Sequence, residues 1–230
     1  MNKILVDKEN NIEIKDNAVE LNIQVPELTI NVKGKVLNQE MLKKENENLN
    51  LTINIEPNSS LIYNRFILHN EANNNINIIQ DNNSNVVFNY SYIAYDKVKI
   101  NVNSELKGNN NETEIKVAAV TEEKGNTVVS STADILPNIK DNNLIESIKI
   151  LLINNEESVC IPNLLVSSDE VEVNHAATIS CIDPNYLFYL NSKGLSTEAS
   201  TKLIKNGFLL NNLDINENLK EQINDLIGGK

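Results

Sequence analysis

The amino-acid sequence predicts a mainly β protein, with a repetitive strand region over residues 1–183 and a small helical region over residues 184–230. Short strand candidates alternate apolar and polar residues through the first region, and turn-forming Asn, Gly, Pro and Ser residues separate them. From Asp183 onward, helix-capping residues and helical spacing replace this pattern. At 230 residues, the chain is long enough to bury a large core.

The strand region repeats at a spacing of roughly 23 to 24 residues. Apolar–Asn–apolar triplets mark one strand of each repeat, at 53–55, 76–78 and 100–102. Second strand candidates lie at 61–63, 86–88 and 114–117. Two short strands per repeat suit a β-solenoid, in which each coil stacks on the last. An antiparallel sandwich also gives evenly spaced short strands, so the spacing favours the solenoid without deciding it.

Asparagine makes up about one residue in five, a bias that usually marks disorder. Here it alternates with Ile, Val and Leu at the period of a strand, so we expect ordered structure. In a solenoid, equivalent Asn side chains can hydrogen-bond in ladders along the stack, and other Asn residues can occupy turns.

The first 50 residues repeat less clearly, which is typical of the capping coils of a solenoid. Residues 39–48, with the sequence QEMLKKENEN, are strongly charged, and we expect a surface loop or a short helix there. His69 has no recognisable partner pattern and is predicted to lie on the surface.

Three short helices are predicted after the strand region. The first begins at Asp183-Pro184 and ends at Gly194, and the second begins at Ser196 and is expected to end at Gly207. The third covers residues 216–227, where apolar residues form one stripe. Helices this short cannot hold a core alone, so they must cap the solenoid or dock on a partner.

Composition excludes several functions. A net charge of −12 and a pI near 4.7 argue against binding to nucleic acid, as does an aromatic content of only 4%. No apolar run approaches the ~20 residues of a membrane helix, and the N-terminus is too polar for a secretory signal. Two cysteines give no disulfide framework, so a reduced, cytoplasmic setting follows most simply.

His175 is the leading candidate for a functional residue, because it directly follows a short strand, although a histidine in that position is more often structural. Cys160 could accept sulfur or bind iron as a thiolate, but a buried structural role is at least as expected. Cys181 is better explained as a coincidental surface thiol. The three residues lack the close spacing of a preformed metal site.

No phosphate-binding loop, nucleophile elbow or zinc-protease helix occurs in the sequence, so we expect neither an ATP site nor enzymatic activity. Acidic pairs such as Asp169-Glu170 resemble the carboxylates of β-helical polysaccharide enzymes. A solvated turn explains this pair better, and the scarcity of aromatic residues weakens the case for a sugar-binding groove.

One segment carries a family resemblance, in a dozen or so positions spread in fixed order from Pro162 to Phe208. Its parts are Pro162-x-Leu164, Val171…His175-x-Ala177-Thr178, Ile182-Asp183, Phe188-Tyr189-Leu190-x-Ser192-Lys193-Gly194-Leu195 and Gly207-Phe208. This pattern resembles the C-terminal signature of the SufB/SufD family, the scaffold subunits of the Suf iron–sulfur cluster assembly system, which work with the ATPase SufC. The resemblance implies a right-handed parallel β-helix, which decides between solenoid and sandwich.

The resemblance also implies roles for particular residues. His175 would lie near the subunit interface where a cluster forms, as a transient iron or cluster ligand, with Cys160 as a weaker second candidate. The SufB branch has an acidic residue directly after this histidine, whereas here Ala176 takes its place, which is nearer to the SufD branch. The helices after Pro184 would dock SufC, through these apolar residues: Leu187, Phe188, Tyr189, Leu195, Leu203 and Phe208.

The expected function is therefore a non-catalytic scaffold that binds a SufC-type ATPase and either a second SufB/SufD-type subunit or a copy of itself. A transient cluster shared across an interface stays open, whereas a cluster bound stably by the monomer is not expected. Two alternatives are a degenerate SufD-like paralogue that binds the ATPase without cluster chemistry, and a β-helical protein that binds or cleaves polysaccharides. Relative to the family, the chain reads as compact, lacking an N-terminal helical region and about one coil near 128–150.

Overall fold

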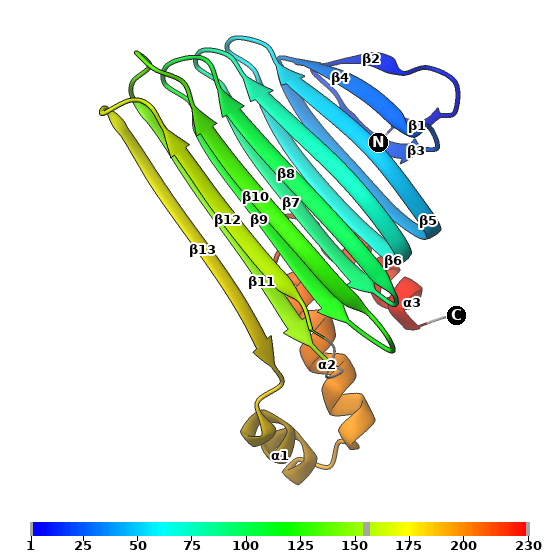
Figure 1. Ribbon diagram of the computed structural model, residues 1–230. Helices are drawn as coiled ribbons and strands as arrows, with labels where there is room; N and C mark the ends of the chain where they lie inside the picture. Colours follow the sequence, from blue (N-terminus) through cyan, green and yellow to red (C-terminus); the bar gives the residue numbers. More distant parts are fainter. Residues whose placement is uncertain (1, 154–156, 229–230) are drawn as a thin grey trace.

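A computed structural model describes residues 2–153 and 157–228, with the backbone alone at residues 43–45. In this part of the chain, thirteen strands form one hydrogen-bonded sheet in which the strands pair in parallel, and three helices follow. The sheet winds into a β-solenoid of about six turns (Figure 1). The predicted fold class is confirmed.

The solenoid has two faces, and successive strands alternate between them. The first face contains β1 (Asn2–Val6), β3 (Ala18–Ile23), β7 (Asn85–Ala94), β9 (Glu112–Thr121), β11 (Asn142–Leu152) and β13 (Val171–Cys181). The second contains β2 (Asn11–Lys15), β4 (Glu27–Lys33), β8 (Lys97–Leu106), β10 (Asn126–Ile135) and β12 (Val159–Val166). Two 21-residue strands, β5 (Lys35–Ile55) and β6 (Ser60–Gln80), run through both faces.

The coils lengthen along the chain, and the predicted spacing of 23 to 24 residues is wrong. Paired positions are 19 residues apart at Val19 and Asn38, and 31 residues apart at Val128 and Val159. Ile53 pairs with Ile78, and not with the first residue of the 76–78 triplet. Longer corners add residues to each later coil, so comparison of look-alike triplets misplaces the register by two positions.

Apolar residues on alternate positions of both faces fill the interior. In β10, for example, every second residue from Thr127 to Ile135 is buried. Equivalent residues stack coil on coil, as Leu51 does on Ile76. Burying such side chains contributes roughly 1.5–3 kcal/mol each before the entropy of ordering the chain is counted.

The asparagines form ladders and turns, as predicted. Asn31 Nδ2 donates to Asn11 Oδ1 at 2.8 Å, and Asn54 Nδ2 donates to Asn31 Oδ1 at 2.9 Å. Further ladder bonds join Asn75 to Asn50, Asn101 to Asn75, and Asn103 to Asn77. Other asparagines occupy left-handed turn positions, at Asn58, Asn83 and Asn110. Asn tolerates this backbone conformation better than most residues, which explains its recurrence at equivalent corners.

The helices are α1 (Pro184–Ser192), α2 (Thr197–Leu210) and α3 (Glu217–Gly228). Asp183 caps α1 by accepting from the backbone N–H of Asn185 at 2.8 Å, and Ser196 caps α2. The prediction that α2 ends at Gly207 is wrong, because Phe208 and Leu209 continue the helix and pack against the solenoid. None of the helices in the described residues is long and apolar enough to cross a bilayer.

Helices α2 and α3 pack on the outer side of the first face, behind the sheet in Figure 1. The apolar contact joins Leu209 and Ile223 to residues such as Phe66 and Ile93. Polar bonds fasten the same contact: the following list gives them. Asn64 exchanges two bonds with the backbone of Asp214, Ser91 Oγ donates to the carbonyl of Leu209, and Lys205 pairs with Glu122. Helix α1, by contrast, has no buried residue.

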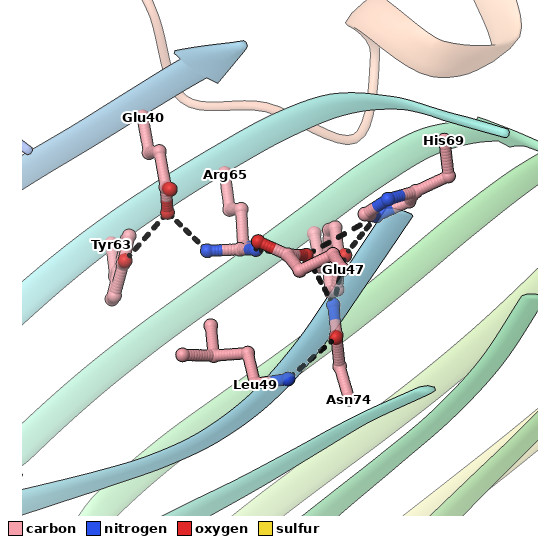
Figure 2. Close-up of polar contacts among 8 residues, drawn as sticks. Glu40, Glu47, Leu49, Tyr63, Arg65, His69 and Asn74 are labelled. Atoms are coloured by element: carbon pink, nitrogen blue, oxygen red, sulfur yellow. Dashed lines mark hydrogen bonds and ion pairs between the residues drawn. The ribbon is translucent and has the colours of Figure 1, made fainter. Parts of the chain in front are cut away.

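The charged segment 39–48 is neither a loop nor a helix, because it belongs to strand β5. Glu40 is fully buried and Glu47 is 6% exposed, and both contact Arg65, which is also fully buried. Arg65 donates to Glu40 Oε2 through Nη1, and its Nη2 lies 2.8 and 2.7 Å from the two oxygens of Glu47 (Figure 2). The charges pair inside the solenoid instead of facing water.

Neutral groups surround this ion cluster. Tyr63 Oη donates to Glu40 Oε2 at 3.0 Å, and Asn74 Nδ2 donates to Glu47 Oε2 at 2.5 Å (Figure 2). Burial alone would lower the pKa of Arg65, but the nearby carboxylates of Glu40 and Glu47 raise it, so the guanidinium stays charged.

His69 also belongs to this cluster, so the prediction of a surface residue is wrong. Its side chain is fully buried, with Nε2 2.6 Å from Tyr90 Oη and 3.8 Å from a Glu47 oxygen. His69 stands on the inward-facing row of β6, next to the corner, where the solenoid interior contains polar partners.

Arg65→Ala should lower the free energy of unfolding by about 3–5 kcal/mol, because it removes the guanidinium from two buried carboxylates. Urea denaturation followed by circular dichroism measures this loss. Lys3→Ala is the control, because the Lys3–Glu20 pair is solvent-exposed and should contribute less than about 1 kcal/mol. Equal stabilities of the two variants would contradict a stabilising role for the buried pair.

Candidate functional site

The solenoid ends at β12 and β13, and no strand of the described chain stacks on this last coil. Figure 1 shows β13 at the edge of the sheet, opposite the N-terminal strands. Residues that would face a buried interior therefore face the open end: Cys160, Pro162 and Leu164 on β12, and Val173, His175, Ala177 and Ile179 on β13. Ile179 is 41% exposed, whereas its partner Ile150 in the preceding coil is fully buried.

His175 lies in the middle of this open row and is exposed. Strands β11 and β13 pair in parallel, which places His175 beside Glu146 of the preceding coil. Residues paired in this way point to the same side of a sheet, so both side chains belong to the row that faces the interior. The structure brings the predicted histidine next to a carboxylate that is distant in sequence.

Glu146 is the residue of this site that sequence reasoning missed. Its side chain is 2% exposed, and its Oε1 accepts a hydrogen bond from Ser131 Oγ, across the interior, at 2.8 Å. Its Oε2 is buried and has no hydrogen-bond partner among the described residues. Burial raises the pKa of Glu146 to about 7, and the bond from Ser131 opposes part of that rise.

A signal for Glu146 exists in the sequence. It stands between Leu144 and Ile148 on the apolar row of its strand, where a charged residue is rarely buried without a partner. Its position beside His175, however, depends on the register of two strands in different coils, which the varying coil length hides.

Cys160 lies on β12, on the opposite face of the last coil from His175. It is half-buried against the main hydrophobic cluster, and burial raises the pKa of its thiol to about 11. At neutral pH the thiol is therefore protonated, which weakens it as a sulfur acceptor or iron ligand. Cys181 is exposed at the end of β13.

These side chains do not form a complete metal centre. Within residues 2–153 and 157–228, no group of three or more His, Cys, Asp or Glu side chains is placed to hold a metal ion. The open end therefore offers separate donors on a surface that another chain or coil could cover.

The helical residues predicted to bind a partner divide into two sets. Phe188 is 76% exposed, Tyr189 58% and Leu203 55%, and Leu195 is also exposed. Leu187 and Phe208 are half-buried, and Phe208 packs toward the solenoid. The first set, together with exposed Tyr186, forms an apolar surface on α1 and the facing part of α2, which we call the α1 patch.

Alkylation of Cys160 by iodoacetamide should rise about tenfold for each pH unit between pH 7 and 10, because only the thiolate reacts and the pKa lies near 11. The measurement uses a Cys181→Ser variant, which leaves Cys160 as the single cysteine. In urea, the rate should level off near the ordinary thiol pKa of about 8.5. A plateau below pH 9 in the folded protein would show that burial does not suppress the thiolate.

Comparison with known proteins gives a consistent family. The family model of the SufBD core domain, described as belonging to SUF system FeS cluster assembly, matches residues 36–208, which is more than half of the chain. The chain is 39% identical to the iron-sulfur cluster assembly protein SufD of Bacillus subtilis over 72 residues, or 30% of this chain and 16% of that protein. It is 37% identical over 65 residues to an iron-sulfur cluster assembly SufBD family protein of Staphylococcus aureus (strain USA300), or 28% of this chain and 14% of that protein.

These alignments span less than a fifth of the length of each relative. The family model extends further, because its match begins in β5, crosses both faces of the solenoid and ends within α2. It therefore includes both His175 and the α1 patch. On this match, the chain belongs to the SufB/SufD family.

Proposed function

We propose that this chain is a non-catalytic scaffold subunit for iron–sulfur cluster assembly. In this role it binds a SufC-type ATPase through the α1 patch and pairs with a second scaffold subunit across its open end. The observation that carries the proposal is the family match, which runs through the solenoid and the helices. The names of the Bacillus and Staphylococcus relatives support the process.

The α1 patch supports the docking of a protein partner. Tyr186, Phe188 and Tyr189 are each more than half exposed on one helix that has no buried residue. A nine-residue helix with no buried face gains little stability from the rest of the chain, so contact with a partner is its natural stabilisation. Exposed aromatic residues of this kind often supply most of the binding energy of an interface.

The connections of the helices support the transmission of force from the ATPase to the site. Only Ile182 and Asp183 separate β13 from α1, so movement of α1 acts directly on the strand that carries His175. Helix α2 is fastened to the outer face through Leu209 and Lys205. An ATPase that changes its spacing during ATP hydrolysis would thus pull on the last coil and open or close the scaffold interface.

The open end supports pairing with a second scaffold. Strand β12 presents Val159, Ile161 and Leu165, which are 44%, 42% and 54% exposed, and β13 presents Ile179. An uncovered edge with this much apolar surface is a template for another chain. The second subunit is either a copy of this chain or a related scaffold, and a transient cluster would form between them with His175 as one ligand.

The polysaccharide alternative receives no comparable support. The large aromatic residues of the solenoid interior, such as Tyr63, Phe88 and Tyr92, are fully buried. Tyr186, Phe188 and Tyr189, the exposed aromatics, stand on α1, away from any solenoid face. A sugar groove needs aromatic side chains along the solenoid, so this distribution favours a protein partner.

Co-expression with a SufC-type ATPase should yield a complex that co-purifies, and Phe188→Glu should abolish it, because the charge would be buried in an apolar contact. Leu5→Glu is the matched control, since Leu5 is 55% exposed at the other end of the solenoid. Thermal denaturation of both variants checks that they fold. Failure of the wild-type chain to form any complex would sink the scaffold proposal.

Light scattering of the purified complex should give two scaffold chains per particle, and Ile179→Arg should reduce this number to one. The reason is that an arginine on the uncovered row of β13 must be desolvated before another chain can cover it. Leu5→Arg again serves as control. A wild-type complex that contains a single scaffold chain would contradict pairing at the open end.

A further inference from the structure

We infer that Glu146 and His175 act together as a binding site for a divalent transition-metal cation, spanning the last two coils of the solenoid. The inference rests on the proposed function, because it names the place where such a scaffold would first hold an iron ion. It adds a ligand, Glu146, that comes from a different coil than the histidine.

The register of the strands provides the geometry. Glu146 and His175 are paired residues of β11 and β13, and neighbouring strands lie about 4.8 Å apart. Both side chains belong to the inward-facing row, with Glu146 below and His175 at the open end. On the facing strands, the corresponding pair is Ser131 and Pro162, and Pro162 offers no side-chain donor. His175 is thus the polar group placed over the carboxylate.

The hydrogen bonds of Glu146 leave one oxygen available. Oε1 accepts from Ser131, whereas the buried Oε2 has no hydrogen-bond partner among the described residues. A buried polar atom without a partner costs about 1–3 kcal/mol, and native proteins seldom keep one without a reason. A glutamine would keep the bond to Ser131 without placing a carboxylate in the core. Stability alone therefore does not account for the carboxylate, but a bound cation would.

The donor set indicates the class of cation. An imidazole nitrogen combined with a carboxylate oxygen suits iron, manganese, cobalt and zinc in their divalent states. This chain supplies two donors, in agreement with the absence of a three-ligand group in the described residues. The remaining coordination positions face the open end, where water, sulfide or a second scaffold can fill them. The site is therefore a half-site that strengthens when another subunit covers it.

The test uses cobalt(II) as an air-stable probe, titrated into the purified chain alone and followed by calorimetry and visible absorption. The wild-type chain should bind one Co²⁺. Glu146→Gln and His175→Gln should each weaken binding by at least about tenfold, within the range seen when groups around a metal are removed. The double variant should lose little more than either single variant, because both side chains hold the same ion.

Glu172→Gln is the matched control, because Glu172 is exposed on the same strand as His175 but points to the opposite side. It should bind Co²⁺ as tightly as the wild-type chain. Co²⁺ should also raise the melting temperature of the wild-type chain and leave that of Glu146→Gln unchanged. The latter comparison separates lost binding from lost folding.

Two results would overturn the inference. One is wild-type affinity for Co²⁺ in the Glu146→Gln variant, which would make the carboxylate a purely structural group. The other is an absence of Co²⁺ binding by the wild-type chain. Neither result bears on co-purification with the ATPase, so failure here and failure of the scaffold proposal are distinguishable.

Discussion

A coil of a parallel solenoid can be buried only by another coil, and this constraint governs the whole molecule. It stacks Ile, Leu and Val of successive coils into one core, and it repeats the same corner conformation at Asn58, Asn83 and Asn110. It also leaves the final coil unfinished, with an apolar row and His175 exposed at β13. The candidate site is thus a direct product of the architecture, because it occupies the one end where the stacking rule has no next layer.

The ion cluster around Arg65 marks the opposite situation, in which charges are enclosed by the stack. It lies at the corner where β5 and β6 pass from one face to the other, and inward side chains of both faces converge there. Fully hydrogen-bonded charges of this kind hold a single arrangement, since a shift of register would separate Glu40 and Glu47 from Arg65. The cluster and the open end divide the solenoid into a rigid middle and an accessible margin.

Local patterns in the sequence predicted much of this structure. The mainly β fold, the Asn ladders, the three helices and the caps at Asp183 and Ser196 all follow from short-range rules. The failures share one cause, which is that burial in a solenoid depends on register between coils of unequal length. Residues 39–48 and His69 looked like surface groups because their partners lie in neighbouring coils. Glu146 was missed for the same reason, while the family pattern located His175 without revealing what lies beneath it.

The amide ladders have a direction. In each of them the Nδ2 group of the later coil donates to the Oδ1 of the earlier one, from Asn31 to Asn11 at the start and from Asn163 to Thr132 Oγ1 at the end. The side-chain dipoles therefore align along the solenoid axis, with carbonyl oxygens directed toward β12 and its free edge. Two identical ends that met about a twofold axis would bring acceptor to acceptor. The ladders consequently stop at such an interface, and the last amide carbonyls there need donors from water or from a chemically different surface.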